Sequence, residues 1–198
     1  MPSASPRIAW LEKTVQPSLA APATVALDKA AGSSAEGGGT QGTAKFLSEA
    51  IHALRVEHSP GTALFSLDRH ATQLGKSAFA HEALLLRVEA MLALHREGEV
   101  LQILDGAALT DVAASRSLLV TRGELRAKAN RCGDGLGDFD LVLAKSKQPD
   151  RQALFGRALC RKKLGDTVGA WADVERYRRE FSTDPRLRDL EQQVGVLR

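Results

Sequence analysis

The sequence predicts an all-α protein, built from antiparallel helix hairpins that stack into a short right-handed solenoid. The composition favours helices, because Ala and Leu are plentiful while aromatic residues make up only 5% of the chain. From Thr43 onward, apolar residues recur at helical spacing. Gly98, Gly133 and Gly165 interrupt this pattern at intervals of 35 and 32 residues. A period near 34 residues with a glycine at each hairpin turn is typical of helical solenoids.

Residues 1–42 differ from the rest of the chain. Four of the seven prolines lie there, together with five glycines and many Ala, Ser and Thr residues. Such a segment buries too little apolar surface to offset the entropy lost on ordering. We therefore expect a flexible, disordered tail or linker at 1–42, followed by a helical repeat domain at 43–198. Residues 7–15 have a short apolar face and are either a partly ordered stub or a docking segment.

The clearest hairpin spans Asp150 to Phe181, with a tight turn at Leu164-Gly165-Asp166. Ser59-Pro60 is a strong start signal for an earlier helix, and Asp184-Pro185 for the last one. We expect about seven to nine helices, the last of which caps the apolar end of the final hairpin. In order, the expected segments are 43–54, 60–74, 77–97, 100–104, 110–131, 136–143, the hairpin at 150–181, and 185–197.

The hairpin at 150–181 resembles the tetratricopeptide repeat over the stretch LFGRALCRKKLGDTVGAWADVERY. Ala158 and Ala170 stand at the family's small helix-contact positions, and Leu164-Gly165-Asp166 matches its turn. Arg157 departs from the pattern, which has Leu there. The resemblance covers residues 43–185 and implies a non-enzymatic scaffold that binds a segment of a partner protein on its concave face.

A second resemblance lies in FLSEAIHALRVEHSPGTALFSLDRHATQL, at 46–74, together with AFAHEALLLRVEAMLAL, at 78–94. This stretch is similar to repeat domains attached to bacterial anti-sigma and envelope-stress regulators, in which a Pro/Ala/Gly-rich linker often follows a membrane anchor. It implies, as the alternative function, a regulatory or assembly domain of a bacterial envelope system. The chain contains no apolar run long enough to span a membrane. We expect a soluble protein, and its compartment, cytoplasmic or periplasm-facing, stays open.

Catalytic, metal and cofactor sites are not expected. The five histidines lack the spacing that brings imidazoles onto one ion, and GDGLGDFD at 133–140 lacks the ligand pattern of a calcium loop. Cys132 and Cys160 are the only cysteines. We expect them on neighbouring helices about a turn apart in height, too far for a disulfide, so they are interpreted as packing residues. No small-molecule substrate is expected.

Partner binding is therefore assigned to basic side chains. Arg122, Arg126, Arg157 and Arg161 fall on the predicted first helices, where they can pair with acidic side chains or a C-terminal carboxylate. The formal net charge of +3 and the lack of aromatic residues among the basic clusters make nucleic acid an unlikely partner.

Overall fold

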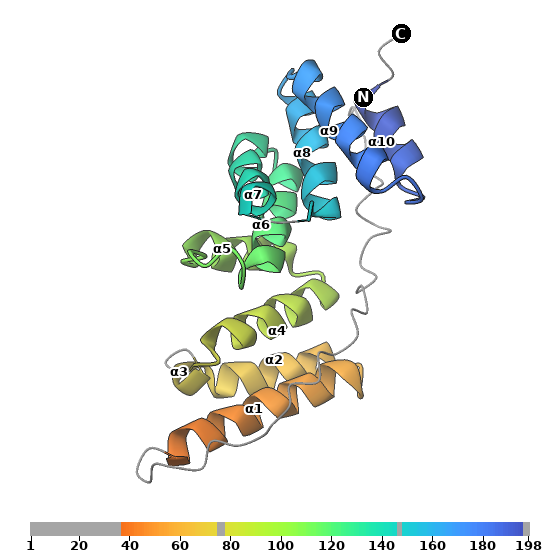
Figure 1. Ribbon diagram of the computed structural model, residues 1–198. Helices are drawn as coiled ribbons and strands as arrows, with labels where there is room; N and C mark the ends of the chain where they lie inside the picture. Colours follow the sequence, from red (N-terminus) through yellow and green to blue (C-terminus); the bar gives the residue numbers. More distant parts are fainter. Residues whose placement is uncertain (1–36, 75–77, 146–147, 196–198) are drawn as a thin grey trace, which may run out of the picture. The chain divides into compact units, whose positions relative to one another are not determined.

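The computed structural model describes residues 37–74, 78–145 and 148–195, and all the regular elements in these ranges are α-helices (Figure 1). The ten helices are α1 (Gly37–Arg55), α2 (Pro60–Arg69), α3 (Ala71–Leu74), α4 (Ala80–Ala93), α5 (Glu97–Gly106), α6 (Arg116–Lys128), α7 (Cys132–Lys145), α8 (Arg151–Lys163), α9 (Thr167–Glu180) and α10 (Leu187–Val194). This count exceeds the expected seven to nine. The all-α prediction is confirmed.

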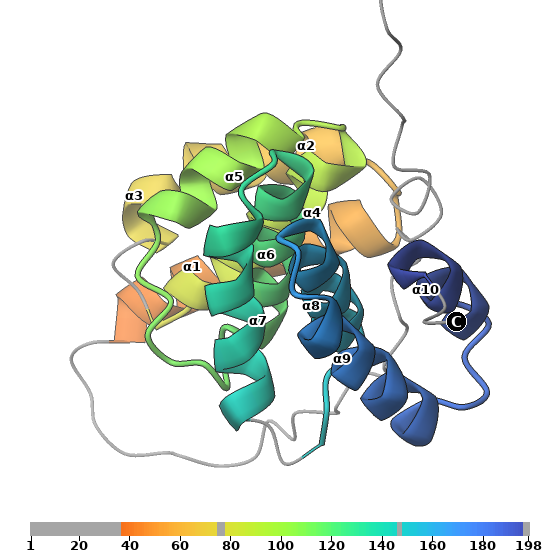
Figure 2. The same cartoon turned by 90° about the horizontal axis from the view of Figure 1, so that it is seen from above.

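Helices that follow one another in the chain pack against each other. The pairs α1–α2, α4–α5, α6–α7 and α8–α9 are hairpins, and α2 with α4, α5 with α6, and α7 with α8 join each pair to the next. The view from above shows α7 and α8 side by side (Figure 2). Helix α10 packs on α8 and α9 and buries Leu190 and Val194 there.

The apolar core follows this order of packing. One cluster of buried side chains runs from Leu47 of α1 to Leu125 of α6. Beyond it, Phe139, Leu154 and Tyr177 are fully buried in the last two hairpins. The core is thus shared between neighbouring hairpins, which is how a helical hairpin buries an apolar face that it cannot cover alone.

The turns of the last three hairpins repeat at a constant interval. His95, Asn130 and Gly165 have φ values of 58°, 62° and 85°, and they lie 35 residues apart. Each follows the end of a first helix, where a left-handed residue lets the chain reverse. Only the third of these residues is a glycine.

Gly98 and Gly133 are therefore not the hairpin breaks that the sequence predicted. Each is the second residue of a helix, α5 or α7, and a Cβ on either would meet no atom within 4 Å. Glycine is tolerated at these positions because its cost in backbone entropy applies to the interior of a helix, and both residues are in the first turn. The interval of 32 residues between Gly133 and Gly165 is therefore not the spacing between two turns.

Two further boundaries differ. The helix expected from Thr110 or Asp111 begins at Arg116, and Asp111 Oδ1 instead accepts the N–H groups of the two residues that form the preceding turn. The helix expected at 60–74 breaks at His70, whose ring stacks on Phe46 with centroids 3.3 Å apart.

Helix α1 begins at Gly37, inside the segment 1–42 that was expected to be a tail or linker. Residues 37–42 form the first turns of α1, because extending an already packed helix costs far less than nucleating one. The rest of the tail, including residues 7–15, lies outside the described residues.

Candidate functional site

The four arginines singled out from the sequence form two similar clusters. Arg122 and Arg126 lie on α6, and Arg157 and Arg161 lie 35 residues further on, on α8. Each pair surrounds one buried aspartate of the following helix, Asp138 on α7 or Asp173 on α9. The site residues of the prediction are thus brought together in pairs, around acidic partners that the sequence analysis did not identify.

The first cluster places two guanidinium groups on one carboxylate. Arg122 Nη2 donates to Asp138 Oδ1 at 2.7 Å, and its Nε donates to both carboxylate oxygens. Arg126 Nη1 donates to Asp138 Oδ2 at 2.8 Å and to the backbone carbonyl of Asp134 at 3.3 Å. A buried carboxylate held by two forked cations fixes the angle between α6 and α7.

The second cluster repeats these contacts. Arg157 Nη2 donates to Asp173 Oδ1 at 2.5 Å, and Arg161 Nη1 donates to Asp173 Oδ2 at 2.9 Å. Arg161 also donates to the carbonyl of Gly169, which lies 35 residues after Asp134. The Nη2 contact of the first arginine and both Nη1 contacts of the second, to the aspartate and to a backbone carbonyl, are therefore the same in the two clusters.

Each cluster also reaches back to the preceding hairpin. Arg122 donates to the Leu104 carbonyl and Arg126 to Asp105, both on α5. Arg157 donates to Asp140 of α7 at 2.7 Å. The arginines therefore face the second helices of the hairpins, and most of their donors are already used within the protein.

The Asp105 carboxylate binds two arginines on the exposed side of the first cluster. It accepts from Arg131 at 2.6 Å and from Arg126 at 2.7 Å. The Arg131 guanidinium, aided by Arg126, holds the pKa of Asp105 below its ordinary value even though partial burial opposes this. The carboxylate stabilises the fold above its unfolded pKa, and this contribution is lost as the pH falls through the lower folded value.

The hairpin α4–α5 lacks the cluster. The positions 35 residues before Arg122, Arg126 and Asp138 are Arg87, Met91 and Ile103. Met91 is buried in the core, and Arg87 forms an ion pair with Asp68 of α2 instead. Apolar packing can replace a buried ion pair without loss of stability, so this hairpin keeps the turn and not the charges.

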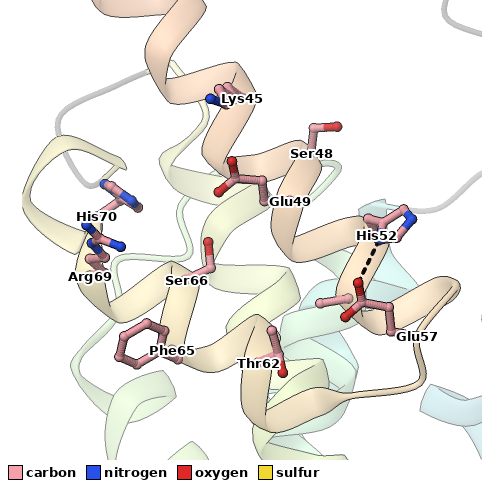
Figure 3. A pocket seen from close by; sticks show the side chains of 11 residues that line it. Lys45, Ser48, Glu49, His52, Glu57, Thr62, Phe65, Ser66, Arg69 and His70 are labelled. Atoms are coloured by element: carbon pink, nitrogen blue, oxygen red, sulfur yellow. Dashed lines mark ion pairs between the residues drawn. The ribbon is translucent and has the colours of Figure 1, made fainter.

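A separate feature is an open groove between α1 and α2, with a volume of about 550 Å³ (Figure 3). Phe65 of α2 lies in its wall with 67% of its surface exposed. The remaining lining is polar or small: Lys45, Ser48, Glu49, His52, Ala53, Glu57, Thr62, Ser66, Arg69 and His70. The sequence analysis did not single out this site.

The charges of the groove are separated along its length. Lys45, near the start of α1, lies at the same end as Arg69 and His70, near the end of α2 (Figure 3). Glu57 lies at the other end, where its carboxylate is 3.2 Å from His52 Nδ1. The groove therefore has three cationic side chains toward one end and Glu57 at the other, with Glu49 between them (Figure 3).

Several polar groups of the groove have no partner within the described part of the chain. Lys45, Glu49 and Arg69 form no ion pair there, whereas the four arginines of the clusters are all paired. The hydroxyl oxygen of Ser66 is shielded from solvent and has no hydrogen-bond partner. Unsatisfied buried polar atoms are uncommon in folded proteins.

In the ranges that the structure covers, no three His, Cys, Asp or Glu side chains are grouped closely enough to hold a metal ion. Among the helices of these ranges, none is both long and apolar enough to cross a membrane.

Comparison with protein-family models, curated proteins and solved structures finds no match to this chain.

Proposed function

We propose that the helices form a tetratricopeptide-like solenoid that acts as a non-enzymatic module for binding a segment of a partner protein. The constant 35-residue interval of the turns and the repeated arginine–aspartate clusters support a solenoid. In such arrays each unit contacts its neighbours, and the surface along the array is the part available for binding.

The partner segment is placed in the α1–α2 groove. The observation that carries this choice is the coincidence there of an exposed Phe65 with unpaired charges and the unsatisfied Ser66 hydroxyl. An exposed aromatic side chain bordered by polar groups is typical of the centre of a protein interface. Arg122, Arg126, Arg157 and Arg161 would then support the module from within, because their donors are already used by aspartates.

The order of charges along the groove determines which partner segments can bind there. An apolar side chain would cover Phe65, an acidic residue would pair with Lys45 and Arg69, and a basic residue with Glu49 or Glu57. His52, whose ring nitrogen Nδ1 lies 3.2 Å from the Glu57 carboxylate, is seven residues after Lys45 on α1, which corresponds to roughly 10 Å. The acidic and basic residues of the segment would be about seven positions apart in a helix and about three in an extended strand.

A peptide-display selection with the full chain tests this proposal. Selected peptides should carry the charge order given above, and Phe65→Ala should weaken their binding about tenfold. Lys45→Glu combined with Arg69→Glu should weaken acidic peptides further. Val168→Ala is the matched control, because Val168 is 82% exposed on α9, outside the groove, and its replacement should leave affinity unchanged.

Two results would count against the groove. One is a set of peptides whose affinity is the same for the Phe65→Ala chain and the unaltered chain. The other is binding that depends on Arg157 or Arg161 while the fold, checked by circular dichroism, is intact. The second result would indicate that the partner binds at the arginines and not in the groove.

A further inference from the structure

The two thiols of the chain lie in contact, contrary to the expected difference of a helical turn in height. Cys160 Sγ donates a hydrogen bond to Cys132 Sγ over 2.8 Å. Cys132 is the first residue of α7, and Cys160 lies near the end of α8. No disulfide joins them, and both are buried. The prediction failed because helix register alone does not fix how far α7 is shifted along α8.

A second contact holds the same two segments together. Lys163 Nζ, three residues after Cys160, donates to Asn130 Oδ1 at 2.5 Å. Asn130 is the left-handed turn residue two positions before Cys132. The approach of the sulfur atoms is thus part of the packing between α7 and α8 and does not depend on one side-chain rotamer.

We propose that Cys132 and Cys160 form a redox site, which takes up a disulfide by exchange with a small-molecule disulfide such as oxidised glutathione. One cysteine, as its thiolate, attacks a sulfur of glutathione disulfide; an S–S bond to the protein forms and one glutathione thiolate leaves. The second cysteine then loses its proton and attacks the protein sulfur of this mixed disulfide. The protein disulfide forms, a second glutathione thiolate leaves, and the oxidant is reduced by two electrons.

Cys132 is the first cysteine to react. It is 4% exposed and borders the exposed turn residues of α6–α7, whereas Cys160 is completely buried. Burial, together with the hydrogen bond to Cys132, raises the pKa of the Cys160 thiol, which keeps it protonated until its neighbour has reacted. Cys160 is therefore the resolving cysteine.

The disulfide would join the hairpin α6–α7 to the hairpin α8–α9. Its loop includes all of α7 and the segment that leads to α8. A cross-link across such a loop stabilises the folded chain, chiefly by restricting the unfolded one. Oxidation would therefore make these two hairpins a single stable unit.

The test equilibrates the full chain with mixtures of reduced and oxidised glutathione. Equilibrium is approached from the reduced protein and from protein oxidised while unfolded and then refolded. Intact mass, thiol labelling after unfolding, and peptide mapping are measured, with Cys132→Ala and Cys160→Ala as matched controls. We expect loss of both thiols without a glutathione adduct, a Cys132–Cys160 peptide, and a thermal midpoint raised by several degrees.

The single variants should show, at most, a glutathione adduct, and it should form more slowly on the chain that retains only Cys160. The proposal is overturned if both thiols persist under excess oxidised glutathione from both directions. It is equally overturned if the cross-linked chain melts below the reduced chain, because the native packing would then not accommodate the bond.

Discussion

The Asp173 carboxylate is shielded from water and accepts hydrogen bonds from Arg157 Nε, Arg157 Nη2 and Arg161 Nη1. Two cations converge on it from α8 while the aspartate itself belongs to α9. Such an arrangement adds little net stability compared with apolar packing, but removing one partner leaves a buried charge without compensation.

Asp173→Ala should therefore be strongly destabilising. We expect the free energy of unfolding to fall by about 3–5 kcal/mol, measured by urea denaturation. Glu175→Ala, two residues further along α9, is the matched control, because the Glu175–Arg178 ion pair is exposed on both sides. Its cost should be below about 1 kcal/mol. Equal effects of the two substitutions would show that the buried cluster is not a special contributor.

Glu124 of α6 gives the chain a pH-dependent contribution of the opposite sign to that of Asp105. Burial raises its pKa to about 7, against the opposing charges of Arg186 and Lys128. A carboxyl whose folded pKa exceeds the unfolded value of about 4.3 is most favourable below that unfolded value. Its contribution to stability is lost as the pH rises toward 7.

Glu124→Gln should remove this loss. At pH 8 the variant should exceed the unaltered chain in free energy of unfolding by on the order of 1–3 kcal/mol. The difference should shrink toward pH 4, where the glutamate is also neutral. Urea denaturation at several pH values measures it, and Glu82→Gln, an exposed position on α4, is the control. A difference that does not vary with pH would contradict the assignment.

At the scale of the helices, Phe139 of α7 is a wedge between α6 and α8. Its ring is fully buried, and it lies against Gly123 of α6 and Gly156 of α8. A Cβ on Gly156 would be 2.4 Å from the tip of the ring, and one on Gly123 would be 2.7 Å from its edge. The two glycines allow three helices to approach one another around a single aromatic ring.

Gly156→Ala should therefore lower the free energy of unfolding by about 1–3 kcal/mol, because the ring is held on both sides and cannot move away. Gly137→Ala is the matched control, since Gly137 is in α7 and a Cβ there would meet nothing within 4 Å. That substitution should raise stability by about 0.5–1 kcal/mol through helix propensity. Thermal or urea unfolding shows whether each substitution lowers or raises the stability. A Gly156→Ala chain as stable as the unaltered chain would contradict the close packing of Phe139 against Gly156.

For the whole molecule, the sequence predicts the last hairpin well. Asp150 and Asp166 cap α8 and α9 through their side chains, and Gly165 has the left-handed conformation that the turn requires. These signals are local, so they can be recognised without knowing the neighbours. The turns at His95 and Asn130 were missed because residues other than glycine seldom adopt positive φ. Asn130 was the available clue, since Asn tolerates this conformation better than most residues.

The candidate sites depend on contacts between helices, which a sequence shows less directly. The arginines were identified by their charge, but their aspartate partners were not. The sequence does contain a repeated pattern: two arginines are four positions apart, and an aspartate, Asp138 or Asp173, lies twelve positions after the second arginine. The α1–α2 groove had no such signal, because which charges remain unpaired depends on the rotation of each helix against the next.

The equal spacing of His95, Asn130 and Gly165 has a consequence for how the length of this chain can change. A stretch of 35 residues contains one left-handed turn, at least one complete helix beside that turn, and one set of positions for the ion-pair cluster. Duplicating the whole stretch would repeat the contacts that the two clusters share, in which two arginines donate to one aspartate. A change of any other length would rotate α6 against α7, or α8 against α9, and would separate the paired charges.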